Sequence, residues 1–166
     1  MRTPKNSRPF TCRQADAILV VAHPNYHDEL REVFCVDVTA SGPELNVTKR
    51  NGLDYLRAHS ACQKVIIVDA VRPAIEPTVL DRFFTLLDNY DAVASARKIT
   101  DSLGRHGQWI VNRDEYYTLS APEGFRFPLI DRHFRADSPL TESLQQLPES
   151  SNVYLDFSVP YYDKLT

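Results

Sequence analysis

The chain has 166 residues, 43% of them apolar and 25% charged, with a formal net charge of −3. This composition indicates one globular domain with a buried core, and it shows no excess of positive charge that would favour nucleic-acid binding. No apolar run approaches the roughly 20 residues that span a bilayer, and the N-terminus is too polar for a secretory signal, so we expect a cytoplasmic protein without a membrane partner.

The first part of the chain alternates predicted strands and helices. Residues 1–14 are polar and basic and are predicted to form a tail, and residues 15–166 are predicted to form one domain. The predicted strands are 15–22, 35–40, 64–68 and 91–97. The predicted helices between them are 24–34, 47–58 and 77–89. This alternation predicts an α/β fold with a mostly parallel sheet, right-handed crossovers and flanking helices.

The pattern weakens after Arg97. Residues 98–113 are polar and turn-rich and are predicted to project as an arm or a β-hairpin. Residues 116–127 are interrupted by Pro122 and Gly124 and are predicted to be irregular. The remaining predicted elements are short helices at 128–135 and 140–147 and a late strand at 152–159.

The third predicted strand runs directly into a carboxylate, Asp69. Val65–Val68 consists of four β-branched residues, which is typical of a strand covered on both faces. Because the carboxyl ends of parallel strands open into the ligand crevice of an α/β sheet, we expect Asp69 at the rim of a site. A carboxylate there suits Mg²⁺ held against nucleotide phosphates. The alternative is that Asp69 caps the next helix, but Pro77 is better placed to open that helix.

Five short motifs carry a family resemblance. They are ASGPELNVTKRNGL at Ala40–Leu53, VDAVRP at Val68–Pro73, ITDSLGR at Ile99–Arg105, NRDEYYTLSAPEGFRF at Asn112–Phe127 and KLT at Lys164–Thr166. In this order and spacing they resemble the motifs of the polyol-phosphate cytidylyltransferases, which include the methylerythritol phosphate and ribitol phosphate cytidylyltransferases. The resemblance extends over residues 15–166.

The resemblance implies a Rossmann-like nucleotidyltransferase fold and a reaction. CTP and a polyol phosphate would give a CDP-polyol and pyrophosphate, without a covalent enzyme intermediate. By resemblance, Asp69 binds Mg²⁺, Gly42 and Thr48 contact the cytidine, and Arg72 and Lys164 act in catalysis. The candidates for a second magnesium oxygen are Asp137, Asp156 and Asp163.

The resemblance also places the second substrate. Ser102 and Arg113 match positions that bind the polyol phosphate, and Arg105 lies in the same motif. Independently of the resemblance, Arg97, Lys98, Arg105 and Arg113 form a basic set around the predicted arm, which suits a dianionic phosphate. A solvated surface with scattered charges is the alternative, and for Arg105 alone it is the better account.

Family members are usually homodimers joined by their arms, so the resemblance implies a homodimer in which Ser102 and Arg113 act in trans. The segments DAVRP (69–73) and RDEYY (113–117) favour ribitol phosphate as the acceptor, with methylerythritol phosphate as the other choice. The product would be a precursor of teichoic acid in the first case and of isoprenoids in the second.

The chain departs from the family on the nucleotide side. The family opens with a strand and a glycine-rich loop around the triphosphate, whereas the first glycine here is Gly42. Met1–Lys5 is similar to the end of that segment, which makes Lys5 the candidate for its catalytic lysine. Leu45, Ala121 and Glu123 stand where the family has arginine, threonine and glutamine. Two hypotheses remain: a shortened enzyme with weak or lost activity, and a non-catalytic relative that binds nucleotides or sugar phosphates or acts as an interaction subunit.

Overall fold

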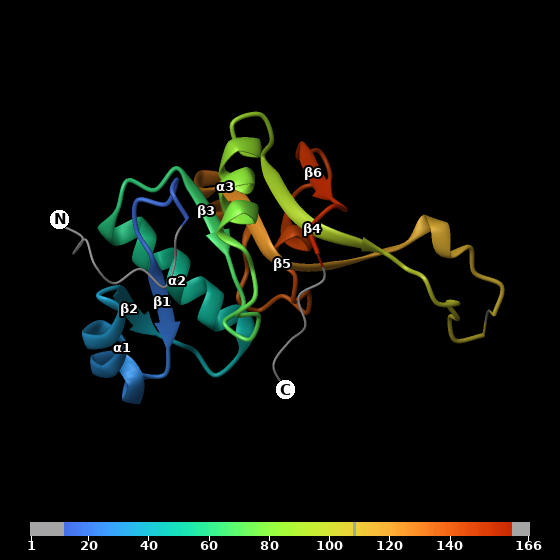
Figure 1. The fold of residues 1–166 in the computed structure, drawn as a ribbon. Helices are drawn as coiled ribbons and strands as arrows, with labels where there is room; N and C mark the ends of the chain where they lie inside the picture. Colours follow the sequence, from blue (N-terminus) through green and yellow to red (C-terminus); the bar gives the residue numbers. More distant parts are fainter. Residues whose placement is uncertain (1–11, 108, 161–166) are drawn as a thin grey trace.

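The computed structural model describes residues 12–107 and 109–160 as an α/β fold of two sheets and flanking helices (Figure 1). Lys5 and Lys164 lie outside the described residues, so the roles expected for them stay predictions. None of the helices in the described ranges is both long enough and apolar enough to cross a membrane.

The smaller sheet consists of two parallel strands, β1 (Leu19–Ala22) and β2 (Asp37–Ala40). A 3₁₀ turn, η1 (Pro24–Tyr26), and helix α1 (His27–Phe34) connect them. Helix α2 (Leu45–His59) follows β2 and packs against both strands.

The larger sheet has four strands in the order β3–β5–β4–β6. Their bounds are β3 (Lys64–Ile67), β4 (Ala92–Lys98), β5 (Tyr117–Arg126) and β6 (Val153–Asp156). Strand β5 is antiparallel to β3 and to β4, while β4 and β6 are parallel. It follows that β3, β4 and β6 run in the same direction and that their carboxyl ends lie along one edge of the sheet.

Strand β5 corrects the prediction that residues 116–127 are irregular. It is ten residues long and lies inside the sheet between β3 and β4. Its register against β4 shifts between Ala94 and Ser95, which leaves Ala121 and Pro122 in a bulge. A bulge is where a strand tolerates proline. At Gly124, an added Cβ would lie 3.3 Å from Cδ1 of Leu87, so the glycine permits close packing of the chain that follows α3.

Helices cover both faces of the larger sheet. Helix α3 (Pro77–Leu86) covers one face, with Phe83 fully buried against Val93 of β4. Helix α4 (Phe127–His133) covers the other face together with α2, and there Ile130 packs with Phe125 of β5. The 3₁₀ turns are η2 (Arg113–Glu115) and η3 (Ser143–Gln146). The turn η3 replaces the longer helix predicted at 140–147.

Most other predicted elements occur within a few residues of their expected bounds, although β1 begins at Leu19 instead of residue 15 and α3 ends at Leu86 instead of residue 89. The strands of the described chain form two separate sheets and not one continuous sheet. Among the described residues, no strand pairs with the second edge of β1 or with the second edge of β3.

The beginning of the described chain is attached to α3. The backbone N–H groups of Arg13 and Gln14 donate to Oδ1 of Asp81, at 2.8 Å and 3.1 Å, and the Cys12 thiol lies 3.1 Å from the same oxygen. The hydrogen bond from the thiol, supported by the two amides, lowers the pKa of Asp81 from its ordinary value. These contacts fix residues 12–14 against helix α3, which covers one face of the larger sheet.

Candidate functional site

Asp69 lies just beyond the carboxyl end of β3. The N–H of Arg72 donates to the carbonyl oxygen of Asp69 at 3.0 Å, which closes a turn. The Arg72 side chain is buried, with 7% of its surface exposed, and its Nε lies 3.6 Å from Oδ2 of Asp69, which keeps 27% of its side-chain surface exposed. Helix α3 is preceded by Glu76 and opens with Pro77, so Asp69 is not its cap.

A second turn, at the carboxyl end of β2, brings together the two residues matched to cytidine contacts. The N–H of Gly42 donates to Oγ1 of Thr48 at 3.0 Å, and the Thr48 hydroxyl lies 3.3 Å from the Gly42 carbonyl oxygen. A Cβ at position 42 would collide with the side chain of Val47, so the turn requires glycine here. The Thr48 hydroxyl thus holds the backbone of the turn in place.

The segment between β4 and β5 projects away from the sheet (Figure 1). Ser102 and Arg105 are exposed on it. Arg113 begins η2 and donates from its guanidinium to the carbonyl oxygen of Thr100, on the opposite side of the projection. Neither Ser102 nor Arg113 lines either of the two cavities described next.

One cavity, of about 310 Å³, lies at the carboxyl end of β4. Its polar lining consists of Arg72, Arg97, Lys98, Thr100, Thr118 and Ser120, with Asp101 as the acidic member. Arg72 therefore links the carboxylate after β3 to the basic residues at the end of β4.

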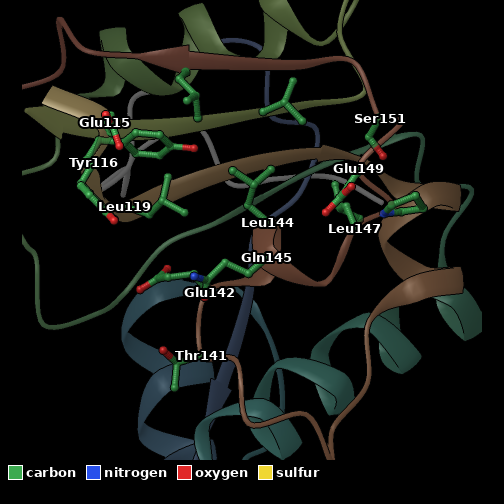
Figure 2. Close-up of a pocket in the computed structure, with 14 residues that line it drawn as sticks. Glu115, Tyr116, Leu119, Thr141, Glu142, Leu144, Gln145, Leu147, Glu149 and Ser151 are labelled. Atoms are coloured by element: carbon green, nitrogen blue, oxygen red, sulfur yellow. The ribbon is translucent and has the colours of Figure 1, made fainter. Parts of the chain in front are cut away.

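The other cavity is larger, about 680 Å³, and lies over β5 and β6 (Figure 2). Figure 2 shows Tyr116 and Leu119 on one side of it, with Leu144 near its centre. Further apolar residues are Leu147, Val153 and Leu155, and its acidic residues are Glu115, Glu142 and Glu149. Its apolar and acidic lining sets it apart from the smaller basic cavity.

Comparison with known proteins places these features in a family. The family model described as IspD, 2-C-methyl-D-erythritol 4-phosphate cytidylyltransferase, matches residues 9–146. The chain belongs to the IspD family.

Individual relatives agree with this assignment. The bifunctional enzyme IspD/IspF of Rhizobium leguminosarum bv. trifolii is 31% identical over 141 residues, covering 76% of this chain and 34% of that protein. The 2-C-methyl-D-erythritol 4-phosphate cytidylyltransferase of Porphyromonas gingivalis is 30% identical over 130 residues, covering 72% of this chain and 57% of that protein. The chain thus spans between about a third and somewhat over half of the length of these curated relatives.

A solved structure shows the same fold. The 4-diphosphocytidyl-2C-methyl-D-erythritol synthase of Anaerococcus prevotii superposes with a TM-score of 0.81 at 18% identity, covering 93% of this chain and 75% of that chain. The predicted α/β nucleotidyltransferase fold is therefore confirmed.

Glu123, where the IspD motif expected from the sequence has glutamine, has a structural role in this chain. Its side chain is 2% exposed, and its two oxygens accept from the backbone N–H groups of Ser143 and Leu144 at 3.0 Å and 2.9 Å. The buried ammonium of Lys49 lies 3.8 Å away and donates to the Thr141 carbonyl oxygen at 2.8 Å. The carboxylate therefore fixes the segment around η3 onto β5, a contact that the sequence did not reveal.

Asp156, considered above as a second magnesium ligand, is also held by protein groups. It is 3% exposed, lies 2.6 Å from Nη2 of Arg82 in α3, and accepts from the N–H and hydroxyl of Ser158 at 2.9 Å and 2.7 Å. These partners give the carboxylate a structural role at the end of β6.

The fit of Asp69 to magnesium can be judged from its surroundings. Within residues 12–107 and 109–160, no group of three or more His, Cys, Asp or Glu side chains is arranged to hold a metal ion. Mg²⁺ is commonly bound by one or two carboxylates together with substrate phosphates. Asp69 in this IspD chain is partly exposed, so it could act as such a carboxylate, with the phosphate oxygens of the nucleotide as the further ligands of Mg²⁺.

Proposed function

We propose that the chain takes part in cytidylyl transfer from CTP to methylerythritol phosphate, with release of pyrophosphate. The observation that carries the proposal is the Asp69–Arg72 pair at the carboxyl edge of β3, next to a basic cavity in a chain of the IspD family. The family model and the Porphyromonas gingivalis relative are named for methylerythritol phosphate, and none of the relatives reported above is named for ribitol phosphate. Methylerythritol phosphate therefore replaces the ribitol phosphate favoured from the sequence.

The chemistry is a direct displacement at phosphorus. A phosphate oxygen of the acceptor forms a bond to the α-phosphorus of CTP, and the bond from that phosphorus to the pyrophosphate leaving group breaks. Mg²⁺, when bound at Asp69, neutralises charge on the phosphates. Arg72 holds the Asp69 carboxylate in place, and the turn of Gly42 and Thr48 receives the cytidine. Positioning and charge neutralisation account for catalysis in such transfers.

The non-catalytic alternative rests on one feature of the sequence. No glycine precedes Gly42, so these 166 residues include no glycine-rich loop to surround a triphosphate with backbone N–H groups. A chain that lacks such donors loses much of its affinity for the nucleotide phosphates. We therefore propose that the 166 residues alone bind CTP weakly and turn over slowly.

Two measurements test this proposal. Calorimetric titration of CTP with Mg²⁺ should show no affinity in the micromolar range, and pyrophosphate release should be slow but should require methylerythritol phosphate. The matched control replaces the acceptor with unphosphorylated methylerythritol, which lacks the attacking oxygen. Micromolar CTP affinity would contradict weak nucleotide binding. An absence of CDP-methylerythritol at high protein concentration would favour the non-catalytic alternative.

We also propose a homodimer joined by the arm, residues 98–113. Trp109 and Ile110 are 85% and 81% exposed there, so the arm carries large apolar side chains into solvent. The larger cavity supplies apolar residues beside Glu115, Glu142 and Glu149, and the arm carries the basic residues Lys98, Arg105 and Arg113. Apolar area and opposite charge together favour docking of one arm on a second copy.

Sedimentation velocity should show a dimer at micromolar concentration. The double variant Trp109→Ser/Ile110→Asp should be a monomer, because it removes the apolar contact and adds a carboxylate facing an acidic rim. Val33→Ser is the matched control, since Val33 is 56% exposed on α1 and away from the arm. A monomeric unmodified chain, or a double variant that still dimerises, would refute the proposal.

A further inference from the structure

The residues expected to bind the two ends of CTP lie on different sheets. The turn of Gly42 and Thr48 follows β2 of the smaller sheet, and Asp69 follows β3 of the larger sheet. Within residues 12–107 and 109–160, no strand of one sheet pairs with a strand of the other. The spacing between the Gly42–Thr48 turn and Asp69 therefore depends on the helices and loops that connect the two sheets.

Helix α2 makes this connection with two of its faces. Thr48 and Gly52, one turn apart, face the smaller sheet. The Thr48 hydroxyl accepts from the Gly42 N–H, and a Cβ at position 52 would lie 3.0 Å from Cγ2 of Val21 in β1. A different face of the helix carries residues three and four positions apart, which contact the larger sheet and its loops: Asn46, Lys49, Arg50 and Leu53.

Asn46 joins α2 to the loop of residues 134–142, which connects α4 to η3. Its Nδ2 donates to the carbonyl oxygens of Ser138 and Leu140, each at 2.9 Å. The residue is 6% exposed, and its Oδ1 is buried without a hydrogen-bond partner in the part of the chain that the structure describes. Because a buried, unpaired oxygen lowers stability, the contribution of this side chain lies in its two donated hydrogen bonds.

Lys49, three residues further along α2, joins the same loop to the larger sheet. Its ammonium donates to the Thr141 carbonyl oxygen at 2.8 Å and lies 3.8 Å from the carboxylate of Glu123 in β5. Glu123 accepts in turn from the N–H of Ser143, at the start of η3. Asn46 and Lys49 together therefore tie the first turns of α2 to a loop that β5 holds in place.

We propose that Asn46 and Lys49 are positioning residues for CTP, which set the spacing between the Gly42–Thr48 turn and Asp69. The inference rests on the proposed function for the identity of the nucleotide. A nucleotide gains from contacts at both places only when their spacing matches its length, as for any two linked sites. Cytidine alone needs only the turn, so its binding does not depend on that spacing.

NMR titrations of the ¹⁵N-labelled chain with cytidine, and with CTP plus Mg²⁺, test this inference. In the unmodified chain, CTP with Mg²⁺ should bind more tightly than cytidine. Asn46→Ala and Lys49→Met should each reduce that advantage about tenfold and leave the cytidine affinity unchanged, because a misplacement of about 1 Å is costly for a ligand held at both ends. Lys49→Arg should restore part of the advantage, since it keeps the charge and the donors. Asn46→Ala leaves no charge without its partner and so tests the inference even where Lys49→Met does not fold.

Matched controls remove similar hydrogen bonds within the larger sheet and its connections. Lys64→Met removes an ammonium that donates to the Phe84 carbonyl oxygen at 2.9 Å. Asn152→Ala removes an amide that donates to the Asn89 carbonyl oxygen at 3.2 Å. Both control variants should keep the ratio of the two affinities. Thermal melts establish that each variant folds.

Spin-label distances measure the spacing of the two sheets without any nucleotide. One label at Val33 on α1, which packs on β2, and one at Thr78 on α3, which packs on β3, are both at exposed positions. The labelled chain, diluted with unlabelled chain, carries substitutions at its three free cysteines, Cys12→Ser, Cys35→Ser and Cys62→Ala. This background should give one narrow distance distribution, and the addition of Asn46→Ala should broaden it.

The two readouts separate this inference from the proposed reaction. A chain that binds neither CTP nor cytidine contradicts the proposed function, and a distribution broadened by Asn46→Ala would still support the role of Asn46 in the spacing. An unchanged distribution, or an affinity ratio that is unchanged in both the Asn46 and Lys49 variants, would overturn the inference even where cytidylyl transfer is observed.

Discussion

Replacing Glu123 with leucine is expected to lower the free energy of unfolding by about 3–5 kcal/mol, because it leaves a buried ammonium without its anionic neighbour. The Lys49 side chain is 8% exposed, and the N–H groups of Ser143 and Leu144 would lose their acceptor as well. Urea unfolding followed by circular dichroism at neutral pH measures the effect. Glu123→Gln should cost less, about 1–3 kcal/mol, because one oxygen acceptor remains.

Two controls make this result specific. Glu29→Gln on α1 changes an exposed carboxylate and should leave the unfolding free energy within about 0.5 kcal/mol of the unmodified value. The double variant Lys49→Met/Glu123→Leu should recover part of the loss, because it removes the stranded charge. A Glu123→Leu chain as stable as the unmodified one would show that the carboxylate does not support the segment around η3.

Asp69→Asn is expected to reduce pyrophosphate release by about 100-fold or more, because it removes the charge that would hold a divalent cation against the triphosphate. The amide keeps the shape of the side chain beside Arg72, and a thermal melt establishes that the fold survives. The same assay, run over a range of Mg²⁺ concentrations, should show a higher requirement for the ion. Asp28→Asn is the matched control, because Asp28 is fully exposed on α1. An unchanged rate for Asp69→Asn would remove Asp69 from the site.

The sequence predicted those elements whose signals are local. The β-branched run before Asp69 identified β3, and Pro77 with the apolar residues that follow identified α3. Strand β5 was missed because its partners, β3 and β4, lie elsewhere in the chain and because Pro122 and Gly124 are usually strand breakers. Here a bulge and close packing against Leu87 give both residues a place in the strand.

The distinction between local signals and contacts that are distant in the sequence also applies to the site. Asp69 was expected at the site because a strand-end position predicts a ligand-facing edge in an α/β sheet, whereas Arg72 was assigned by resemblance, and the roles of both residues stay predictions. The sequence showed the basic set that includes Arg97 and Lys98. It did not show that Thr118 lies opposite Arg97, because that placement is set by the register between β4 and β5. Glu123 could not be predicted, because its two backbone donors lie 20 and 21 residues away along the chain and because it resembles an ordinary surface carboxylate in sequence.

The division of the sheet affects how the protein behaves in concentrated solution. Among the described residues, β1 and β3 each pair on one side only, and each consists mainly of aliphatic residues, Leu-Val-Val-Ala in β1 and Val-Ile-Ile after Lys64 in β3. The unpaired backbone N–H and C=O groups along the edge of an apolar strand form a template on which another polypeptide can add a strand to the sheet. Handling at low concentration, or in the presence of a complementary segment, therefore guards the chain against self-association through these borders.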